Sequence, residues 1–119
     1  MNWYLAKMVF QIICGEGHHR PQFDEQLRLL QAGSREEALH KAQLLGMREQ
    51  ESFFNRQQQL VQWQFVNTSE LYRLDQLVDG AELYSRVEEP EDADHYMHTI
   101  RNRAEQLVFG ETHAILNLA

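Results

Sequence analysis

The chain has 119 residues, the length of one ordinary domain, and 43% of them are apolar, which is enough for a core without disulfides or a structural metal. Its 18 acidic and 11 basic residues give a net charge of −7, and no stripe of Lys and Arg is available for phosphates, so nucleic-acid binding is disfavoured. The only cysteine, Cys14, excludes an internal disulfide framework and suits a reducing compartment. No run approaches the roughly 20 apolar residues of a membrane span, and we expect a cytoplasmic protein.

The first predicted element is a strand from Trp3 to Cys14, rich in β-branched and aromatic residues. Every second residue contributes to one continuous apolar face, on which we expect Met8 and Phe10 to be fully buried. The opposite face is mixed but still mostly apolar, whereas a strand covered on one side only should alternate more cleanly. We therefore expect this second face to be covered as well, either by the C-terminal region or by another subunit.

A loop over Gly15–Pro21 leads into a second predicted strand, Phe23–Ala32. Ser34 and Glu37 then match a capping box, in which each side chain satisfies a backbone donor near the other residue, so a helix should begin here. Apolar residues recur at helical spacing behind this cap. Gly46 either ends the helix or allows its backbone to approach the sheet closely, and the sequence leaves both alternatives open.

The middle of the chain carries weaker signals. Residues 47–59 are mostly polar and are predicted to be a fraying helix end and a loop. A third strand follows, in which alternate residues over 61–65 face inward. Residues 71–74 are an expected extension of this strand, after a bend or bulge near 67–69.

The C-terminal third of the chain begins with a strong turn signal, Asp79–Gly80, which predicts a fourth strand from Ala81 to about Glu88. A helical pattern then covers about residues 92–109, with acids in its first turn and Gly110 as a natural terminator. An apolar tail over 114–118 should dock against other parts of the protein.

The predicted order of elements is thus β-β-α-β-β-α in a single domain over residues 1–119. Strands joined as hairpins, rather than by helical crossovers, favour a mainly antiparallel four-stranded sheet. We expect the helices to pack against this sheet, which makes the fold class α+β.

Five stretches, taken together with their order and spacing, are similar to those of a known family. The stretches are Asn2-Trp3-Tyr4, the strand from Asp24 to Ala32, Ser34-Arg35-Glu36-Glu37-Ala38, the strand from Val61 to Val66, and the segment from Asp79 to Ser85. Over about residues 3–87 the chain resembles a family of small bacterial proteins, the domain of unknown function numbered four-two-eight-eight. That family has no assigned activity, cofactor or catalytic residue, so the resemblance implies no role.

Two pairs of histidines are candidate metal ligands. His18 and His19 lie in the first loop near Glu16, but neighbouring residues on an extended chain point in opposite directions, so a solvated loop is favoured. His95 and His98 lie three apart on the last predicted helix, but both rotate away from its apolar face, which favours a solvated helix surface. We expect no bound metal and no other cofactor.

Two catalytic signals are also weak. Gly15-Glu16-Gly17 is similar to the start of a dinucleotide loop, but Arg20 stands in place of the third glycine and no helix follows. Cys14 could act as a nucleophile with His18 or His19 as its base, but a thiol on an apolar strand face is more often a small buried hydrophobe. Since no set of catalytic residues can be assembled, the sequence favours a protein that is not an enzyme.

Trp3, Leu5, Val9 and Ile13 share the second face of the first strand and are the predicted interface. Our leading hypothesis is a non-catalytic association module that forms a homo-oligomer, most simply a two-fold dimer, through its sheet. In the rival explanation, the final helix crosses over and covers this face itself. The alternative function is a small-molecule-binding or enzymatic domain with a pocket between the sheet and the C-terminal helix.

Overall fold

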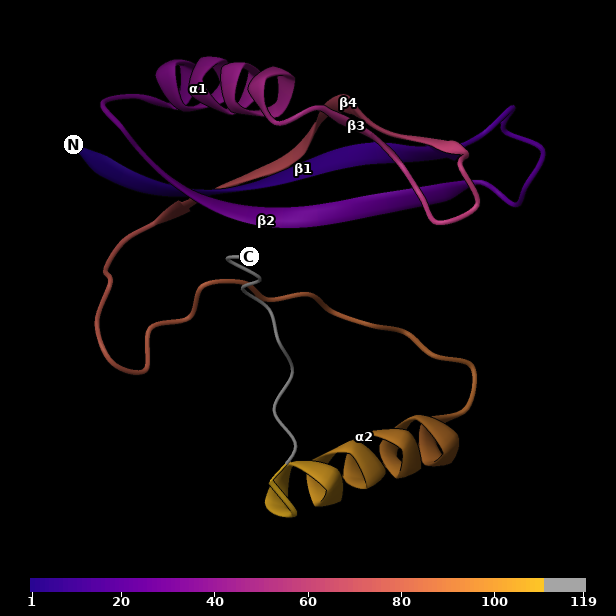
Figure 1. The fold of residues 1–119 in the computed structure, drawn as a ribbon. Coiled ribbons are helices and arrows are strands. Elements are labelled where there is room, and N and C mark those ends of the chain that lie inside the picture. The colour runs from indigo at the N-terminus through magenta and orange to yellow at the C-terminus, as the bar shows by residue number, and fades with distance from the viewer. Residues whose placement is uncertain (111–119) are drawn as a thin grey trace. The chain divides into compact units, whose positions relative to one another are not determined.

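The computed structural model describes residues 1–110, whose elements follow the order β-β-α-β-β-α. The four strands form one antiparallel sheet in the spatial order β2-β1-β4-β3 (Figure 1), which confirms the predicted α+β class. The strands are β1 (Asn2–Cys14), β2 (Gln22–Ala32), β3 (Glu51–Phe54) and β4 (Leu60–Leu74), and the helices are α1 (Arg35–Arg48) and α2 (Ala93–Val108).

β1 is a central strand, paired along its length with β2 on one side and β4 on the other. The register on β4 shifts twice, between Lys7 and Met8 and between Val9 and Phe10. These irregularities are β-bulges, in which β4 carries an extra residue that has no partner on β1. Because there are two bulges, side chains of β4 on either side of them still point to the same face of the sheet as their partners on β1. The predicted extension of this strand to Leu74 is confirmed.

One face of the sheet, here called the first face, carries Tyr4, Ala6, Met8 and Phe10 and packs against α1. Met8 and Phe10 are 0% and 1% exposed, as the apolar pattern predicts. Small residues on the helix allow it to lie close to the strands. The residues that α1, β1, β2 and β4 contribute to the two core clusters are Tyr4, Ala6, Leu30, Ala32, Ala38, Ala42, Leu45 and Leu71.

Gly46 lies inside α1, which continues to Arg48, so this glycine does not end the helix. A Cβ atom built on it would lie 2.4 Å from Cε1 of Phe65 on β4. The Phe65 ring packs in turn against Phe10, with 5.4 Å between ring centroids. Of the two alternatives that the sequence left open, close approach of the helix to the sheet is the one observed.

The predicted strand from Ala81 to about Glu88 is wrong: the segment forms no ladder with the described strands. The turn before it is real, because Ala81 N donates to the Val78 carbonyl at 2.9 Å and Gly80 has φ +85°. The turn at Asp79–Gly80 is therefore formed, but it does not connect two strands of a hairpin. Apolar residues at alternate positions after the turn were not sufficient to form a strand.

The fourth strand is instead β3, inside the segment 47–59 that was predicted to be a helix end and a loop. Its four residues are all exposed, so it has no alternation of buried and exposed positions for a sequence pattern to reveal. The tight connection to β4 is fixed by Asn55, whose Oδ1 accepts from the backbone N–H groups of Gln57 and Gln59 at 3.0 and 2.9 Å.

The chain divides into two compact units, Met1–Ser85 with the sheet and α1, and a second that begins at Arg86 and holds α2. The Asp92 side chain caps α2 by accepting from His95 N, and Gly110 follows its end with φ +97°, close to the predicted bounds. Within residues 1–110, neither helix is long and apolar enough to cross a membrane. The predicted apolar tail over 114–118 lies outside the described residues.

Truncating Phe10 to Ala should lower the free energy of unfolding by about 3–5 kcal/mol, because it removes a fully buried aromatic ring and leaves a cavity. Denaturant melts measure this loss. Phe54→Ala is the matched control, since Phe54 is 68% exposed on β3, and it should cost about 0.5 kcal/mol or less. A loss below about 1 kcal/mol for Phe10→Ala would show that the strand register is wrong.

Gly46→Ala should destabilise the protein by about 1–3 kcal/mol, because the new methyl group overlaps the Phe65 ring. This prediction opposes intrinsic helix propensity, which favours Ala over Gly by about 1 kcal/mol. Gln43→Ala, at an exposed position of the same helix, is the control and should be nearly neutral. If Gly46→Ala stabilised the protein in the same melts, the close packing of α1 on β4 would be contradicted.

Candidate functional site

The predicted interface residues Trp3, Leu5, Val9 and Ile13 lie on the face of the sheet opposite α1, here called the second face. Trp3, Val9 and Ile13 are half-buried within the chain, whereas Leu5 is only 7% exposed. Leu5 is thus part of the protein's own packed interior, and the other three retain accessible apolar surface.

β2 adds three exposed apolar side chains to the second face. Leu29 lies opposite Leu5 in the register and Leu27 lies opposite Lys7. The exposed fractions are 48% for Leu29, 47% for Leu27 and 54% for Phe23, which follows the same alternation. The edge strand therefore exposes more apolar surface than the central strand on which the interface was predicted.

The centre of the second face is polar. Lys7 Nζ lies 2.9 Å from a carboxylate oxygen of Glu25 on β2 and 3.1 Å from one of Glu70 on β4, so an ion-pair network joins three strands. Hydrogen bonds to Glu25 and Glu70 raise the pKa of Lys7. The Tyr72 hydroxyl donates to Glu70, which raises the pKa of Tyr72 to about 12, and the Tyr84 ring packs edge-on against Tyr72 with centroids 5.3 Å apart.

A shallow hollow of about 480 Å³ lies beside β2 at the side of α1. Leu29 of the strand and Leu44 and Leu45 of the helix contribute its apolar lining, together with Trp3. Lys41 closes one side by donating to the Gln31 carbonyl at 2.8 Å. Exposed apolar side chains thus flank the free edge of β2 from both the sheet and the helix.

The first face carries a hydrogen-bonded polar network beyond the apolar core. Asp24 Oδ2 accepts from Trp63 Nε1 at 3.1 Å and from Gln26 Nε2 at 2.7 Å. Arg28 donates to Gln26 and forms a two-bond pair with Glu49 at 2.6 and 2.8 Å, which holds the pKa of Glu49 below its usual range. These groups satisfy one another, so the network ties β2 to the end of α1 and leaves no unpaired group for chemistry.

The first loop uses its histidine and cysteine for local structure. His19 Nε2 accepts from Cys14 N at 3.0 Å, and Nδ1 then donates to the Arg20 carbonyl at 2.8 Å, so both ring nitrogens are engaged. The Cys14 thiol instead contacts Gln59 Oε1 at 3.4 Å and Asn55 Nδ2 at 3.6 Å. Cys14 is half-buried in a polar setting rather than packed as an apolar residue, and the imidazole is directed at its backbone, not at its sulfur.

The other candidate ligands are also dispersed. Within the described part of the chain, no group of three or more His, Cys, Asp or Glu side chains is placed to hold a metal ion. His18, His95 and His98 are exposed. Gly15 and Gly17 have φ of +60° and +80° in the turn between β1 and β2, where glycine is needed for backbone geometry and a strand, not a helix, follows.

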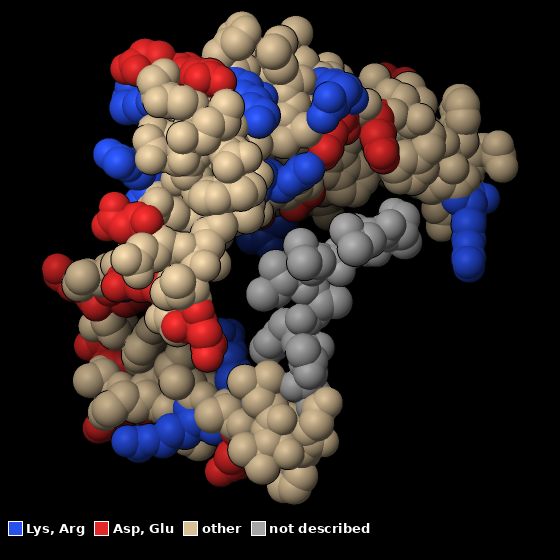
Figure 2. Space-filling view, turned by 90° about the vertical axis from the view of Figure 1, so that its left-hand side faces the viewer, with Lys and Arg blue, Asp and Glu red and all other residues tan. Residues whose placement is uncertain are grey.

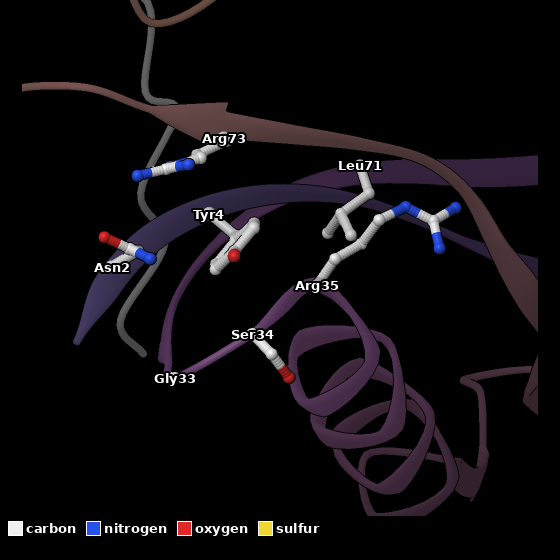
Figure 3. Close-up of a pocket in the computed structure, with 7 residues that line it drawn as sticks. All are labelled: Asn2, Tyr4, Gly33, Ser34, Arg35, Leu71 and Arg73. Carbon is white, nitrogen blue, oxygen red and sulfur yellow. The ribbon is translucent and has the colours of Figure 1, made fainter.

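A pocket of about 450 Å³, which the sequence did not predict, lies where α1 begins (Figure 3). The register places Tyr4 directly opposite Arg73, and α1 begins at Arg35 after its N-cap Ser34. No carboxylate is among its lining residues, although the chain as a whole is acidic. The lining comprises Asn2, Tyr4, Gly33, Ser34, Arg35, Leu71 and Arg73.

The capping box at this end of α1 is confirmed in a slightly altered form. Ser34 Oγ accepts from Glu37 N at 3.1 Å, while the Glu37 carboxylate accepts from Gly33 N at 2.9 Å, one residue before the N-cap. The first N–H groups of a helix have no intrahelical partner. The backbone N–H groups of Arg35 and Glu36 likewise have no hydrogen-bond acceptor within residues 1–110.

The sequence could have revealed half of this pocket. The capping motif locates the start of α1, and Tyr4 is the polar-tipped member of an otherwise apolar strand face. Arg73 could not be found in this way, because its position opposite Tyr4 depends on the pairing of β4 with β1.

Residues 3–85 match the model of a family described as "Domain of unknown function (DUF4288)". The match covers the sheet and α1 and ends with the first compact unit. No curated protein and no solved structure matches the chain. As the motifs in the first two-thirds of the sequence indicated, the chain belongs to the DUF4288 family.

Proposed function

We propose that the protein is a non-catalytic, cytoplasmic association module that forms a homo-oligomer through its sheet, at the edge strand β2. The observation that carries this proposal is the row of exposed apolar side chains Phe23, Leu27 and Leu29 on one strand. Large apolar groups at this exposure cost free energy in water, at roughly 25 cal/mol per Å² of apolar area. Burial against a second copy would recover that free energy.

The free edge of β2 supports the same proposal. Among the described strands β2 pairs only with β1, so one side of its 11 residues retains unpaired backbone groups. Exposed edges of this kind are templates for pairing with another chain. The charges that would oppose such pairing are already neutralised within the chain, because Glu25 pairs with Lys7 and Arg28 with Glu49.

One two-fold register fits the chemistry of β2. Antiparallel pairing of two copies centred on Gln26 would place Phe23 beside Leu29 of the second copy and Asp24 beside its Arg28. Centring on Glu25 or on Arg28 would instead place like charges opposite each other, which is destabilising. A two-fold contact uses the same strand on both copies, as the commonest oligomers do.

The polar groups give little support to catalysis or nucleic-acid binding. Many of the charged side chains of the sheet are paired with one another in two networks, one around Lys7 and one around Arg28. Figure 2 shows Lys and Arg interspersed with Asp and Glu, rather than in one continuous basic stripe, over the described residues of the face that it draws. An extended nucleic acid would require such a stripe.

Small-molecule binding is a second candidate function, supported by the pocket of Figure 3. The sequence-based alternative was a pocket between the sheet and the C-terminal helix. The pocket of Figure 3 is a different one, because it lies between the sheet and the start of α1.

Light scattering and sedimentation at micromolar concentration should show a dimer of the wild-type protein. Leu29→Glu should weaken this dimer at least about tenfold, since each tenfold is about 1.4 kcal/mol, and leave a folded monomer. Phe54→Glu is the matched control on the opposite edge strand and should leave the dimer intact. Leu5→Glu should unfold the protein, because Leu5 is buried within the chain.

Circular dichroism of each variant separates loss of association from loss of folding. A wild-type protein that is monomeric at micromolar concentration would refute the proposal. Equal dimerisation of Leu29→Glu and Phe54→Glu would exclude β2 as the contact.

A further inference from the structure

We propose that the pocket at the start of α1 binds the phosphate or carboxylate group of a small organic anion. This inference goes beyond association through β2 and uses the opposite face of the sheet. It depends on three features of the pocket: the hydroxyl of a buried tyrosine that has no hydrogen-bond partner among the described residues, guanidinium groups without a strong partner, and the free N–H groups at a helix N-terminus.

The Tyr4 hydroxyl is the most informative of these features. The side chain is only 4% exposed, yet within residues 1–110 its hydroxyl forms no hydrogen bond. Figure 3 shows this hydroxyl at the end of the ring, between Asn2 and Ser34 and turned into the pocket. The ring is thus held by the core while its hydroxyl reaches the pocket, where it can donate a hydrogen bond to an acceptor on a ligand.

The two arginines make the pocket cationic. Arg73 is paired with Tyr4 across the β1–β4 ladder, and in the described part of the chain it forms no ion pair. The guanidinium of Arg35 has only a loose contact with Glu36, at 4.0 Å between exposed side chains, and such contacts contribute little. Both guanidinium groups are therefore available to an anion.

The arrangement has two ends. In Figure 3 the Arg73 guanidinium and the Asn2 amide lie on one side of Tyr4, whereas the Arg35 guanidinium lies on the other side, beyond Leu71. Arg73, Asn2 and the Tyr4 hydroxyl are thus the group that would hold the oxyanion. Arg35 adds positive charge at the far end, and Leu71 gives the pocket an apolar wall.

The helix N-terminus adds a favourable field and two donors. The partial positive charge at the start of a helix stabilises an anion there, and the N–H groups of Arg35 and Glu36 are not used within the described residues. The Glu37 carboxylate opposes a second anion, but it is already held by the Gly33 N–H. The N–H groups of Arg35 and Glu36 are therefore suited to a single oxyanion group rather than to several linked phosphates.

The size and charge of the pocket define the ligand class. A volume of about 450 Å³ lies in the range of small-molecule sites. A polynucleotide is disfavoured by the net charge of −7. A small molecule with one phosphate or carboxylate and a compact apolar body fits both the cationic end and Leu71.

The test is a titration of the ¹⁵N-labelled protein, followed by NMR, with inorganic phosphate, phenyl phosphate and benzoate as probes. We expect saturable shifts of the backbone amides of Arg35 and Glu36, and tighter binding of phenyl phosphate than of inorganic phosphate. Tyr4→Phe, which keeps the buried ring, and Arg73→Gln should each raise the Kd about tenfold, the effect of losing a charge-assisted hydrogen bond. Arg20→Gln, in the β1–β2 loop, is the control and should leave the Kd unchanged.

The relative affinity of phenyl phosphate and benzoate identifies which oxyanion the pocket prefers. Shifts that grow without saturation for all three probes, or that are equal in Tyr4→Phe, Arg73→Gln and Arg20→Gln, would overturn the proposal, because they indicate only general screening of surface charge. Thermal melts of Tyr4→Phe confirm that the variant is folded before its Kd is compared.

Discussion

The pairing of β1 with both of its neighbours is the constraint on which the rest of the structure depends. Through β4 it brings Tyr4 beside Arg73 and Phe10 beside Phe65, and through β2 and β4 together it holds Lys7 between two carboxylates. Because side chains alternate along a strand, the same pairing separates an apolar first face, on which α1 packs through Gly46, from a second face with a charged centre. A slip of one residue would exchange these two faces and destroy both the core and the pocket.

The sequence predicts elements correctly where burial is periodic. The alternation over β1, the cap at Ser34 and the amphipathic pattern of α2 each correspond to an observed element. It fails at β3, because four exposed residues carry no such pattern, and at residues 81–88, because a good turn does not guarantee that a strand will find a partner. Both errors concern non-local pairing, which local propensity does not encode.

The candidate sites show the same division. The apolar character of the second face could be predicted, but the exposed side chains lie mainly on β2, whereas Leu5 is packed within the chain. The pocket at the start of α1 could not be predicted, since it needs the register of a β4 strand with two bulges to bring Arg73 to Tyr4. The apolar second face could thus be predicted from the residue pattern of single strands, whereas the pocket at the start of α1 depends on how two distant strands pair.

The most direct test of this account is the register of β4 on β1, measured by interstrand NOEs in solution. The two bulges predict backbone NOEs between Tyr4 and Arg73 and, in the same sample, between Phe10 and Phe65. A continuous ladder without bulges would retain the first contact but place Phe10 opposite Asn67. Observation of the Phe10–Phe65 contact would support the account, and a Phe10–Asn67 contact in its place would contradict it.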